Sequence, residues 1–348
     1  MSDLVSASHN PHGNHPERLG QERVSATAQK LEQVLYELKK IVVGQEYLLE
    51  RLLVAVIAGG HVLVEGAPGL AKTLTLKTLA DVLAVAFKRI QFTPDLLPGD
   101  LIGTRIYHPA QGHFNTELGP IFANFILADE INRSPAKVQS ALLEAMQEQQ
   151  VTIGKETYPL AAPFLVMATQ NPIESEGTYP LPEAQLDRFL FKLLVAYPNA
   201  QEELTIIQRM SGEAMPVLEK VLNAEQLLAI REQAAHVYLD PKIMEYIVRL
   251  VQATRSPEAS ARPSDFNISA HLYCGASPRG SLSLSHAARA LALLRGRNYV
   301  LPADITALAK DCLRHRLLLT YEAIAQGHSA DSLLDSLLES NPAPTLTA

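Results

Sequence analysis

One stretch of the chain decides its fold: Gly66-Ala67-Pro68-Gly69-Leu70-Ala71-Lys72-Thr73. It follows the short apolar run from His61 to Glu65 and leads into a helical pattern. That is the strand, loop and helix order that a phosphate-binding loop requires. Backbone N–H groups at the start of such a helix hold phosphate oxygens. The Lys72 ammonium neutralises their charge, and the Thr73 hydroxyl is a ligand for Mg²⁺. The stretch therefore predicts a site for a phosphate chain and Mg²⁺.

One residue of this loop departs from the usual pattern G-x-x-x-x-G-K-[ST], because Ala71 stands where the second glycine is expected. Alanine is strained at positive φ, since its Cβ crowds the backbone. We therefore expect Ala71 to be helical if the loop binds phosphate. The alternative is an ordinary strand-to-helix turn that happens to contain a lysine.

A pair of acidic residues ends a second apolar run, Phe125-Ile-Leu-Ala-Asp129-Glu130. The pair follows Lys72 by 129 − 72 = 57 residues, an interval that suits a P-loop fold. We expect Asp129 to bind Mg²⁺ through water. Glu130 would orient and polarise the attacking water, because phosphoryl transfer to water needs positioning more than covalent chemistry. A strand end followed by a capping acid is the alternative, and the preceding loop weighs against it.

A third polar residue, Asn171, follows the apolar run from Phe164 to Thr169. The carboxyl ends of parallel strands meet at one edge of a sheet, so this strand would bring Asn171 to the loop and the acid pair. There it would help to position the attacking water. A simple Asn-Pro turn is the alternative.

Apolar runs and helical patterns alternate through the first part of the chain. Further apolar runs lie at Phe87 to Phe92 and Phe189 to Val195, and helical spacing recurs at Ala26 to Val43, Tyr47 to Ile57 and Ser134 to Gln149. Ser134 is the predicted N-cap of the last helix. This alternation predicts an α/β fold with a mostly parallel sheet that is covered on both faces.

Two segments interrupt the alternation with hairpin-like patterns, Thr104 to Glu117 and Val151 to Leu160. After Tyr197-Pro198, helical periodicity dominates, which predicts a separate all-helical domain. The predicted organisation is a flexible tail at 1–24, an α/β domain at 25–197, a helical domain at 198–328 and a tail at 329–348. The Leu pairs of the last segment could instead form a short docking helix.

The composition is that of a globular protein, with 47% of the 348 residues hydrophobic and 19% charged. A formal net charge of −7 gives no overall attraction to nucleic acid. Only two cysteines are present, Cys274 and Cys312, which argues against a disulfide framework. No stretch approaches the length of a membrane span, so we expect a cytoplasmic protein. Spaced histidines such as His9, His12 and His15 can bind metal, but a flexible polar tail is the better interpretation.

Six motifs, taken in order, resemble those of the MoxR family of AAA+ ATPases. They are Val43-Gly44-Gln45, Gly66 to Thr73, Leu127-Ala-Asp-Glu-Ile-Asn-Arg133, Ala168-Thr-Gln-Asn-Pro-Ile173, Leu181-Pro-Glu-Ala-Gln-Leu-Asp-Arg-Phe189 and Ser277-Pro-Arg-Gly280. The match spans roughly residues 25 to 320. The family's loop usually has alanine before its lysine, as at Ala71. The resemblance implies a P-loop AAA+ domain with a parallel five-stranded sheet and hairpin inserts, followed by an all-helical lid.

Carried over residue by residue, the resemblance gives roles to further side chains. Asn171 corresponds to sensor 1, Arg188 to an arginine finger that reaches the γ-phosphate of a neighbouring subunit, and Arg279 to sensor 2 of the lid. Arg133 would be a further inter-subunit contact. The alternatives are a surface ion pair for Arg188, a helix cap for Arg279 and a helix end for Gly44. The nucleotide would be held by Gly44, Gln45, Gly66, Ala67, Pro68, Gly69, Leu70, Ala71, Lys72, Thr73 and Leu74.

The resemblance implies Mg²⁺-dependent ATP hydrolysis in a homo-oligomeric ring. A hexamer is the expected state, because an arginine finger acts across a subunit boundary. It also implies a chaperone-like role in the assembly, activation or cofactor or metal insertion of a client protein complex, often with a partner that carries a von Willebrand factor A domain.

Two other functions compete with this one. A nucleotide-gated scaffold with slow turnover is disfavoured by the complete machinery of Lys72, Glu130 and Arg188. A DNA-remodelling motor is disfavoured by the acidic net charge and by a second hairpin whose only basic residue is Lys155.

Overall fold

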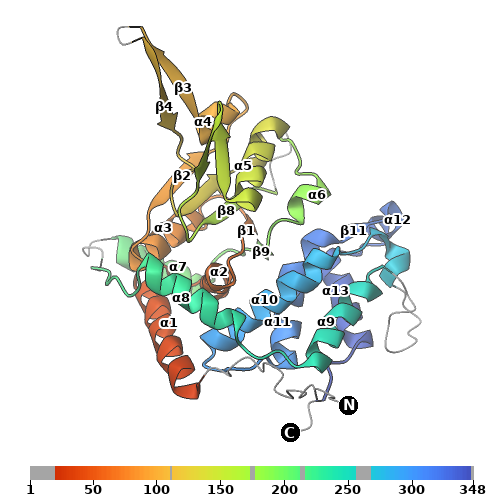
Figure 1. Cartoon of the computed structure of the whole chain (residues 1–348). Helices are drawn as coiled ribbons and strands as arrows, with labels where there is room; N and C mark the ends of the chain where they lie inside the picture. Colours follow the sequence, from red (N-terminus) through yellow and green to blue (C-terminus); the bar gives the residue numbers. More distant parts are fainter. Residues whose placement is uncertain (1–19, 110–111, 173–176, 212–215, 256–267, 346–348) are drawn as a thin grey trace, which may run out of the picture.

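Five parallel strands form the central sheet of the protein (Figure 1). The structure is a computed structural model that describes residues 20–109, 112–172, 177–211, 216–255 and 268–345. The strands are β1 (Val62–Glu65), β2 (Phe87–Gln91), β5 (Phe125–Asp129), β8 (Leu165–Gln170) and β9 (Phe191–Leu194). Their order is β2-β5-β8-β1-β9. The predicted parallel α/β fold is confirmed.

The strands β1, β5 and β8 are buried on both faces, which explains why they read as continuous apolar runs. Successive side chains of a strand point to opposite faces. Val62 and Val64 accordingly pack in one core with α1 (Gln21–Ile41), α2 (Glu46–Ala58) and α3 (Lys72–Val82). Leu63 packs in the other core with α4 (Pro98–Ile102) and α5 (Ala136–Glu148). A short helix, α6 (Glu183–Leu186), leads to β9.

The predicted N-terminal tail at 1–24 is too long, because α1 begins at Gln21, ahead of the predicted Ala26. The helix buries Val24, Leu31 and Leu38 against the sheet domain. An apolar residue as early as Val24 extends the helical pattern into the predicted tail. The histidines of the tail at positions 9, 12 and 15 lie outside the described residues.

The predicted cap of α5 is also corrected. Pro135, and not Ser134, is the N-cap residue. Ser134 is fully buried, and its hydroxyl donates to the carbonyl of Ile131 at 3.3 Å. The hydroxyl thus closes the short 3₁₀ turn η1 (Ile131–Arg133) that follows the acid pair, in place of capping the helix.

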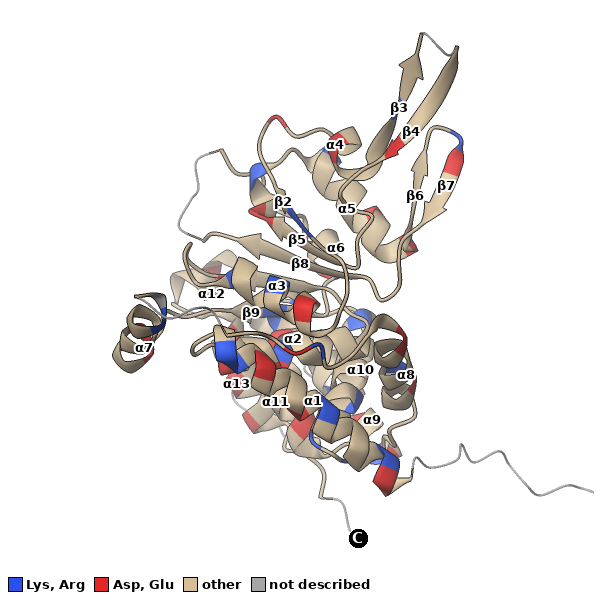
Figure 2. Cartoon of the chain, turned by 90° about the vertical axis from the view of Figure 1, so that its left-hand side faces the viewer, with Lys and Arg blue, Asp and Glu red and all other residues tan. Residues whose placement is uncertain are grey.

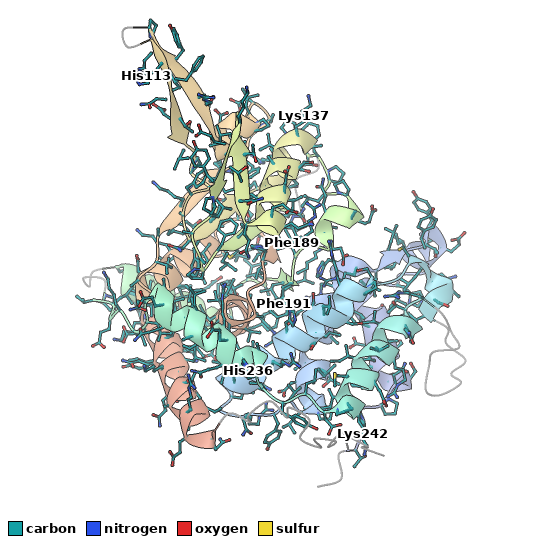
Figure 3. The ribbon with its side chains drawn as sticks, in the orientation of Figure 1. His113, Lys137, Phe189, Phe191, His236 and Lys242 are labelled. Atoms are coloured by element: carbon teal, nitrogen blue, oxygen red, sulfur yellow. The ribbon has the colours of Figure 1, made fainter. Side chains whose placement is uncertain are left out.

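Two antiparallel hairpins extend from the sheet domain. β3 (Gly103–His108) pairs with β4 (His113–Leu118), and β6 (Gln150–Ile153) pairs with β7 (Glu156–Pro159). Figure 2 shows the two hairpins projecting from the same side of the sheet, and His113 marks the far end of the longer one in Figure 3. Both predicted hairpins are confirmed.

A mostly helical part follows β9. It contains α7 (Ala200–Met210), α8 (Ala224–Ala235), α9 (Pro241–Ala253), α10 (Pro278–Leu294), α11 (Pro302–Leu313), α12 (Tyr321–Ala325) and α13 (Ala330–Ser340), with the 3₁₀ turns η3 (Ile268–His271) and η4 (Arg314–Arg316). The all-helical prediction is corrected in one detail, since β10 (Leu272–Cys274) pairs with β11 (Leu318–Leu319). These strands are too short to show alternation in the sequence. In the described part of the chain, no helix is long and apolar enough to cross a membrane.

The tail predicted at 329–348 is wrong for residues 330–340, which form α13. Ser329 caps this helix by accepting a hydrogen bond from the N–H of Ser332 at 3.1 Å. Leu333, Leu334 and Leu337 are buried in the main core. The alternative prediction, that the Leu pairs of this segment form a short docking helix, is therefore the correct one for residues 330–340.

The helical part packs against the sheet domain through buried polar contacts. Arg51 of α2 pairs with Asp311 of α11 at 2.7 Å, and both side chains are almost inaccessible. The Nε2 of His315 donates to the carbonyl of Phe189 at 3.0 Å. Phe189 and Phe191 lie at the middle of the molecule, between the two parts (Figure 3). Because a buried charge that loses its partner costs several kcal/mol, such contacts resist separation of the two parts.

We predict that Leu334→Ala destabilises the protein by about 2–5 kcal/mol, because it leaves a cavity where a fully buried side chain packs. Urea unfolding followed by circular dichroism measures the loss. Leu204→Ala on α7 is the matched control, since Leu204 is 52% exposed, and its effect should stay within about 0.5 kcal/mol. Equal effects of the two substitutions would contradict the packing of α13.

Candidate functional site

The phosphate-loop stretch connects β1 to α3 in one tight turn. Gly66 has no room for a side chain, because a Cβ there would lie 2.9 Å from the carbonyl oxygen of Val195. Its N–H donates to the carbonyl of Gln170 on the adjacent strand β8 at 3.3 Å. These contacts fix the start of the loop to the carboxyl edge of the sheet.

The helical conformation predicted for Ala71 is wrong. Ala71 is the N-cap residue of α3, with φ of 55° and ψ of 19° in the left-handed region. That conformation costs a residue with a Cβ about 1–2 kcal/mol. The carbonyl of Ala71 accepts hydrogen bonds from the N–H of Thr75 at 2.8 Å and from its hydroxyl at 3.0 Å. Tertiary and helix contacts of the loop therefore override the local preference of alanine.

The Lys72 side chain turns back across its own loop. Its Nζ donates to the carbonyl of Gly66 at 2.7 Å. Burial lowers the pKa of the ammonium group, and the negative charges of Asp129 and Glu130 oppose that shift. The loop thus carries a fixed positive charge beside its own N–H groups, as phosphate binding requires.

The loop opens onto a pocket of about 420 Å³, within the range of about 300–1,000 Å³ that is typical of small-molecule sites. The pocket is lined by the loop from Pro68 to Leu74, by Asp129 and Glu130, by Thr169, Gln170 and Asn171, and by Arg89 and Gln91. The parallel order of the strands delivers these groups to one edge. The structure therefore brings together the predicted loop, the acid pair and Asn171.

Asp129 is held from two sides within this pocket. The Thr169 hydroxyl donates to its Oδ1 at 2.6 Å, and Arg89 donates to its Oδ2 through Nε at 3.0 Å and Nη2 at 2.7 Å. Mg²⁺ prefers oxygen ligands and is usually held by one or two carboxylates together with substrate phosphates. Asp129 and Thr73 supply a carboxylate and a hydroxyl in one pocket. These residues fit the ion, provided that Arg89 shares or releases Oδ2.

Glu130 leaves the strand in a left-handed conformation, with φ of 57°. Its N–H donates to the Thr169 hydroxyl at 2.9 Å. Its carboxylate accepts a hydrogen bond from Gln91 Nε2 at 2.9 Å and pairs with Arg133 Nε at 3.1 Å. The carboxylate is thus held at the pocket by polar partners from two different elements.

Arg89, Gln91 and Thr169 are residues of this site that sequence reasoning missed. Arg89 and Gln91 flank the buried Ile90 on β2, and this alternation marks them as exposed on one face of the strand. In the register of β2 with β5, Gln91 stands beside Asp129. The sequence does not show this proximity, because the hydrophobic pattern of a single strand does not reveal which strand lies next to it in the sheet.

Arg188 and Arg279 lie outside the loop pocket and line a second pocket of about 260 Å³. Asp187 in that pocket already accepts hydrogen bonds from Arg316 Nε at 2.8 Å and from the Ser277 hydroxyl at 2.8 Å. Arg279 lies 3.8 Å from Asp187. The Nε of Arg188 is buried and has no hydrogen-bond partner among the described residues. Neither arginine lines the phosphate loop of its own subunit.

Gly44 and Gln45 form the turn between α1 and α2, with φ of 68° and 54°. They do not line the loop pocket. A Cβ at Gly44 would lie 2.7 Å from the carboxyl carbon of Glu202 on α7, and Gln45 Nε2 donates to the carbonyl of Ala196 at 3.0 Å. The C-cap of α1 is Val42, so Gly44 does not itself end that helix.

We predict that Ala71→Gly raises the free energy of unfolding by about 1 kcal/mol, because glycine adopts the left-handed conformation without strain. Urea unfolding measures the gain. The control is Ala141→Gly inside α5, which should lower stability by about 0.5–1 kcal/mol. A loss of stability in both variants would contradict the left-handed conformation of Ala71.

Known proteins resemble the chain in sequence and in structure. The model of the ATPase family associated with various cellular activities (AAA) matches residues 61–191, and that of the AAA lid domain matches residues 266–337. The chain is 52% identical to the chaperone MoxR1 of Mycobacterium tuberculosis, over 94% of this chain and 86% of that protein. It is 33% identical to the protein MoxR of Methylorubrum extorquens, over 88% of this chain and 93% of that one. The fold is similar to that of an ATPase from Cytophaga hutchinsonii, whose crystal structure superposes with a TM-score of 0.86. The match is 47% identical in sequence and covers 93% of this chain and 98% of that chain. With its loop pocket and helical lid, the chain belongs to the MoxR family of AAA+ ATPases.

Proposed function

We propose that this ATPase hydrolyses MgATP in the loop pocket and uses the resulting conformational change to assemble or activate a client protein complex. The observation that carries the proposal is the convergence of Lys72, Thr73, Asp129, Glu130 and Asn171 on one pocket. Phosphoryl transfer to water is catalysed by positioned charges and an oriented water, without a covalent intermediate on the protein. The five side chains supply both requirements.

Each side chain has a distinct role in this proposal. Lys72 and the loop N–H groups bind the phosphate chain, while Thr73 and Asp129 hold Mg²⁺. The ion, when bound, neutralises negative charge on the outer phosphates. Glu130 accepts a hydrogen bond from the attacking water and draws off its proton, and Asn171 orients the same water. For this, the Glu130 carboxylate has to exchange its present hydrogen-bond partners for water.

Arg188 and Arg279 complete the charge of a neighbouring subunit's site. Both line a pocket separate from the loop of their own subunit, and a buried guanidinium N–H without an acceptor, as at Arg188, is costly unless another molecule supplies one. A head-to-tail contact of this kind forms a ring when the rotation between subunits closes. We infer a hexamer, with Arg133 as a further contact at the same boundary.

The β3–β4 hairpin is the surface that we assign to the client. Tyr107 and Phe114 are 51% and 55% exposed, and their ring centroids lie 5.0 Å apart. Ile106 and Leu118 add further exposed apolar area to the same hairpin. Such gathered apolar side chains are typical of protein-binding surfaces. A relative bears the name chaperone, which supports a protein client. A partner with a von Willebrand factor A domain and a cytoplasmic location complete the proposal.

We predict that Glu130→Gln binds ATP as wild type does but loses turnover by about a hundredfold or more, because the amide cannot accept the proton of the attacking water. Phosphate release measures turnover, and fluorescent nucleotide binding measures affinity. Glu144→Gln is the matched control, since Glu144 is an exposed glutamate of α5. Wild-type turnover in Glu130→Gln would exclude Glu130 from the reaction.

We also predict that Arg188→Ala binds ATP but loses about a thousandfold or more in turnover, as expected for removal of an arginine finger. Mixing it with the inactive Lys72→Ala protein should restore part of the activity. In a mixed ring, a subunit with intact Lys72 can face a neighbour with intact Arg188.

The control for this rescue is a mixture of Lys72→Ala with Glu130→Gln. Both substitutions damage the pocket that each subunit builds for itself, so no boundary in that ring is complete. Activity in the control, or none in any ratio of Lys72→Ala to Arg188→Ala, would contradict a site shared between subunits.

A further inference from the structure

A third, smaller cavity of about 150 Å³ lies among α2, α8 and α10, the helices that meet below the sheet in Figure 1. Arg231 of α8 and His286 and Arg289 of α10 form its polar lining, and Ile57 and Ala58 of α2 are part of its apolar lining. It shares Ala58 and His286 with the Arg188 pocket. None of its three basic residues has a role in the proposed hydrolysis of ATP.

The two guanidinium groups of this cavity, Arg231 and Arg289, have no carboxylate partner among the described residues. No carboxylate is among the described residues that line it. Arg231 Nη2 and Arg289 Nε are buried, and neither has a hydrogen-bond partner in the described part of the chain. Burial lowers the pKa of Arg231 to about 10. Partial burial, together with the charge of Arg289, lowers the pKa of His286. Clustered basic groups of this kind are unfavourable unless an anion joins them.

A purely structural role accounts for only part of this cluster. Arg231 Nε donates to the carbonyl of Val56 at 2.7 Å, near the carboxyl end of α2, where a positive charge is favourable. A guanidinium has five N–H donors. This contact uses only Nε, and the buried Nη2 of Arg231 has no hydrogen-bond partner among the described residues. The end of α2 does not explain why His286 and Arg289 stand in the same cavity.

We propose that Arg231, His286 and Arg289 form a binding site for a small oxyanion of the phosphate class. Guanidinium groups match the oxygens of such an anion with short, charge-assisted hydrogen bonds. The cavity volume of about 150 Å³ equals that of roughly five waters at about 30 Å³ each. It has room for an inorganic phosphate but is smaller than the pockets of about 300 Å³ or more that take larger ligands. The cavity volume therefore favours a small anion over a nucleotide.

The bound anion would join three helices. Arg231 belongs to α8, whereas His286 and Arg289 belong to α10, and the carboxyl end of α2 forms part of the cavity wall. The other end of α2 directly follows the turn at Gly44 and Gln45. Phosphate in the cavity would reduce the repulsion between the basic groups and hold the helical part against α2.

Titration calorimetry and thermal unfolding with inorganic phosphate test the site. The Lys72→Ala protein is the parent, because that substitution weakens phosphate binding at the loop. At constant ionic strength, phosphate should raise the Tm of the parent above its value in chloride, as a ligand of the folded state does. Adding Arg289→Gln should weaken phosphate binding by about tenfold or more and remove most of the rise in Tm. In chloride alone, its Tm should equal or exceed that of the parent, since one of the two guanidinium charges of the cavity is gone.

Two further variants keep the test decisive. His286→Gln changes an exposed side chain and should also weaken phosphate binding. Arg105→Gln on the β3–β4 hairpin is the matched control and should keep the response of the parent. Equal phosphate responses in the parent and in both cavity variants would overturn the proposal. A lack of any phosphate response, with an Arg289→Gln effect on concentration-dependent assembly, would also overturn it and assign the cavity to a carboxylate of a second copy.

Discussion

The fixed register between the ends of β5 and β8 is the constraint on which the site depends. The Thr169 hydroxyl donates to Asp129 at 2.6 Å and accepts a hydrogen bond from the N–H of Glu130 at 2.9 Å, so that one side chain positions both acids. The next residue of β8, Gln170, accepts the N–H of Gly66 at 3.3 Å. Because β8 lies between β5 and β1, it sets the distance between the acid pair and the phosphate loop. Groups held by rigid strands keep such distances more accurately than groups held by free loops.

Two residues with strained, left-handed backbones lie at the same edge of the sheet. Ala71 and Glu130 both have left-handed backbones, with φ of 55° and 57°, at about 1–2 kcal/mol each. At Ala71 this conformation starts α3 directly after the loop, and at Glu130 it ends β5 and begins a 3₁₀ turn. Strained residues persist where the surrounding contacts determine the backbone, and they gather at functional sites. Left-handed backbones also occur away from this edge, at Gln45, Ala84 and Gln149, but Ala71 and Glu130 are the two that belong to the loop and to the acid pair.

The acidic and basic groups of the proposed site lie in different pockets, which the net charge of −7 does not show. The acids of the loop pocket are covered by Arg89 and Arg133, while Arg188 and Arg279 line a different pocket. Under the proposed assembly, a single subunit is therefore incomplete, because its acids and these two arginines lie in different pockets. Only a neighbouring copy would bring the two sets together, which would make catalysis depend on assembly.

By itself, the sequence determined the phosphate loop, the acid pair, Asn171 and the parallel α/β fold with its two hairpins. Each of these depends on spacing within one segment or on the order of segments along the chain, and both are local properties. Only the tertiary structure decided the left-handed Ala71, the docking of α13 and the placement of Arg89 and Gln91 beside the acids. It alone gathered Arg231, His286 and Arg289 in one cavity. The reason is physical: periodicity records which face of an element is buried, whereas long-range packing decides which elements, and hence which charges, meet.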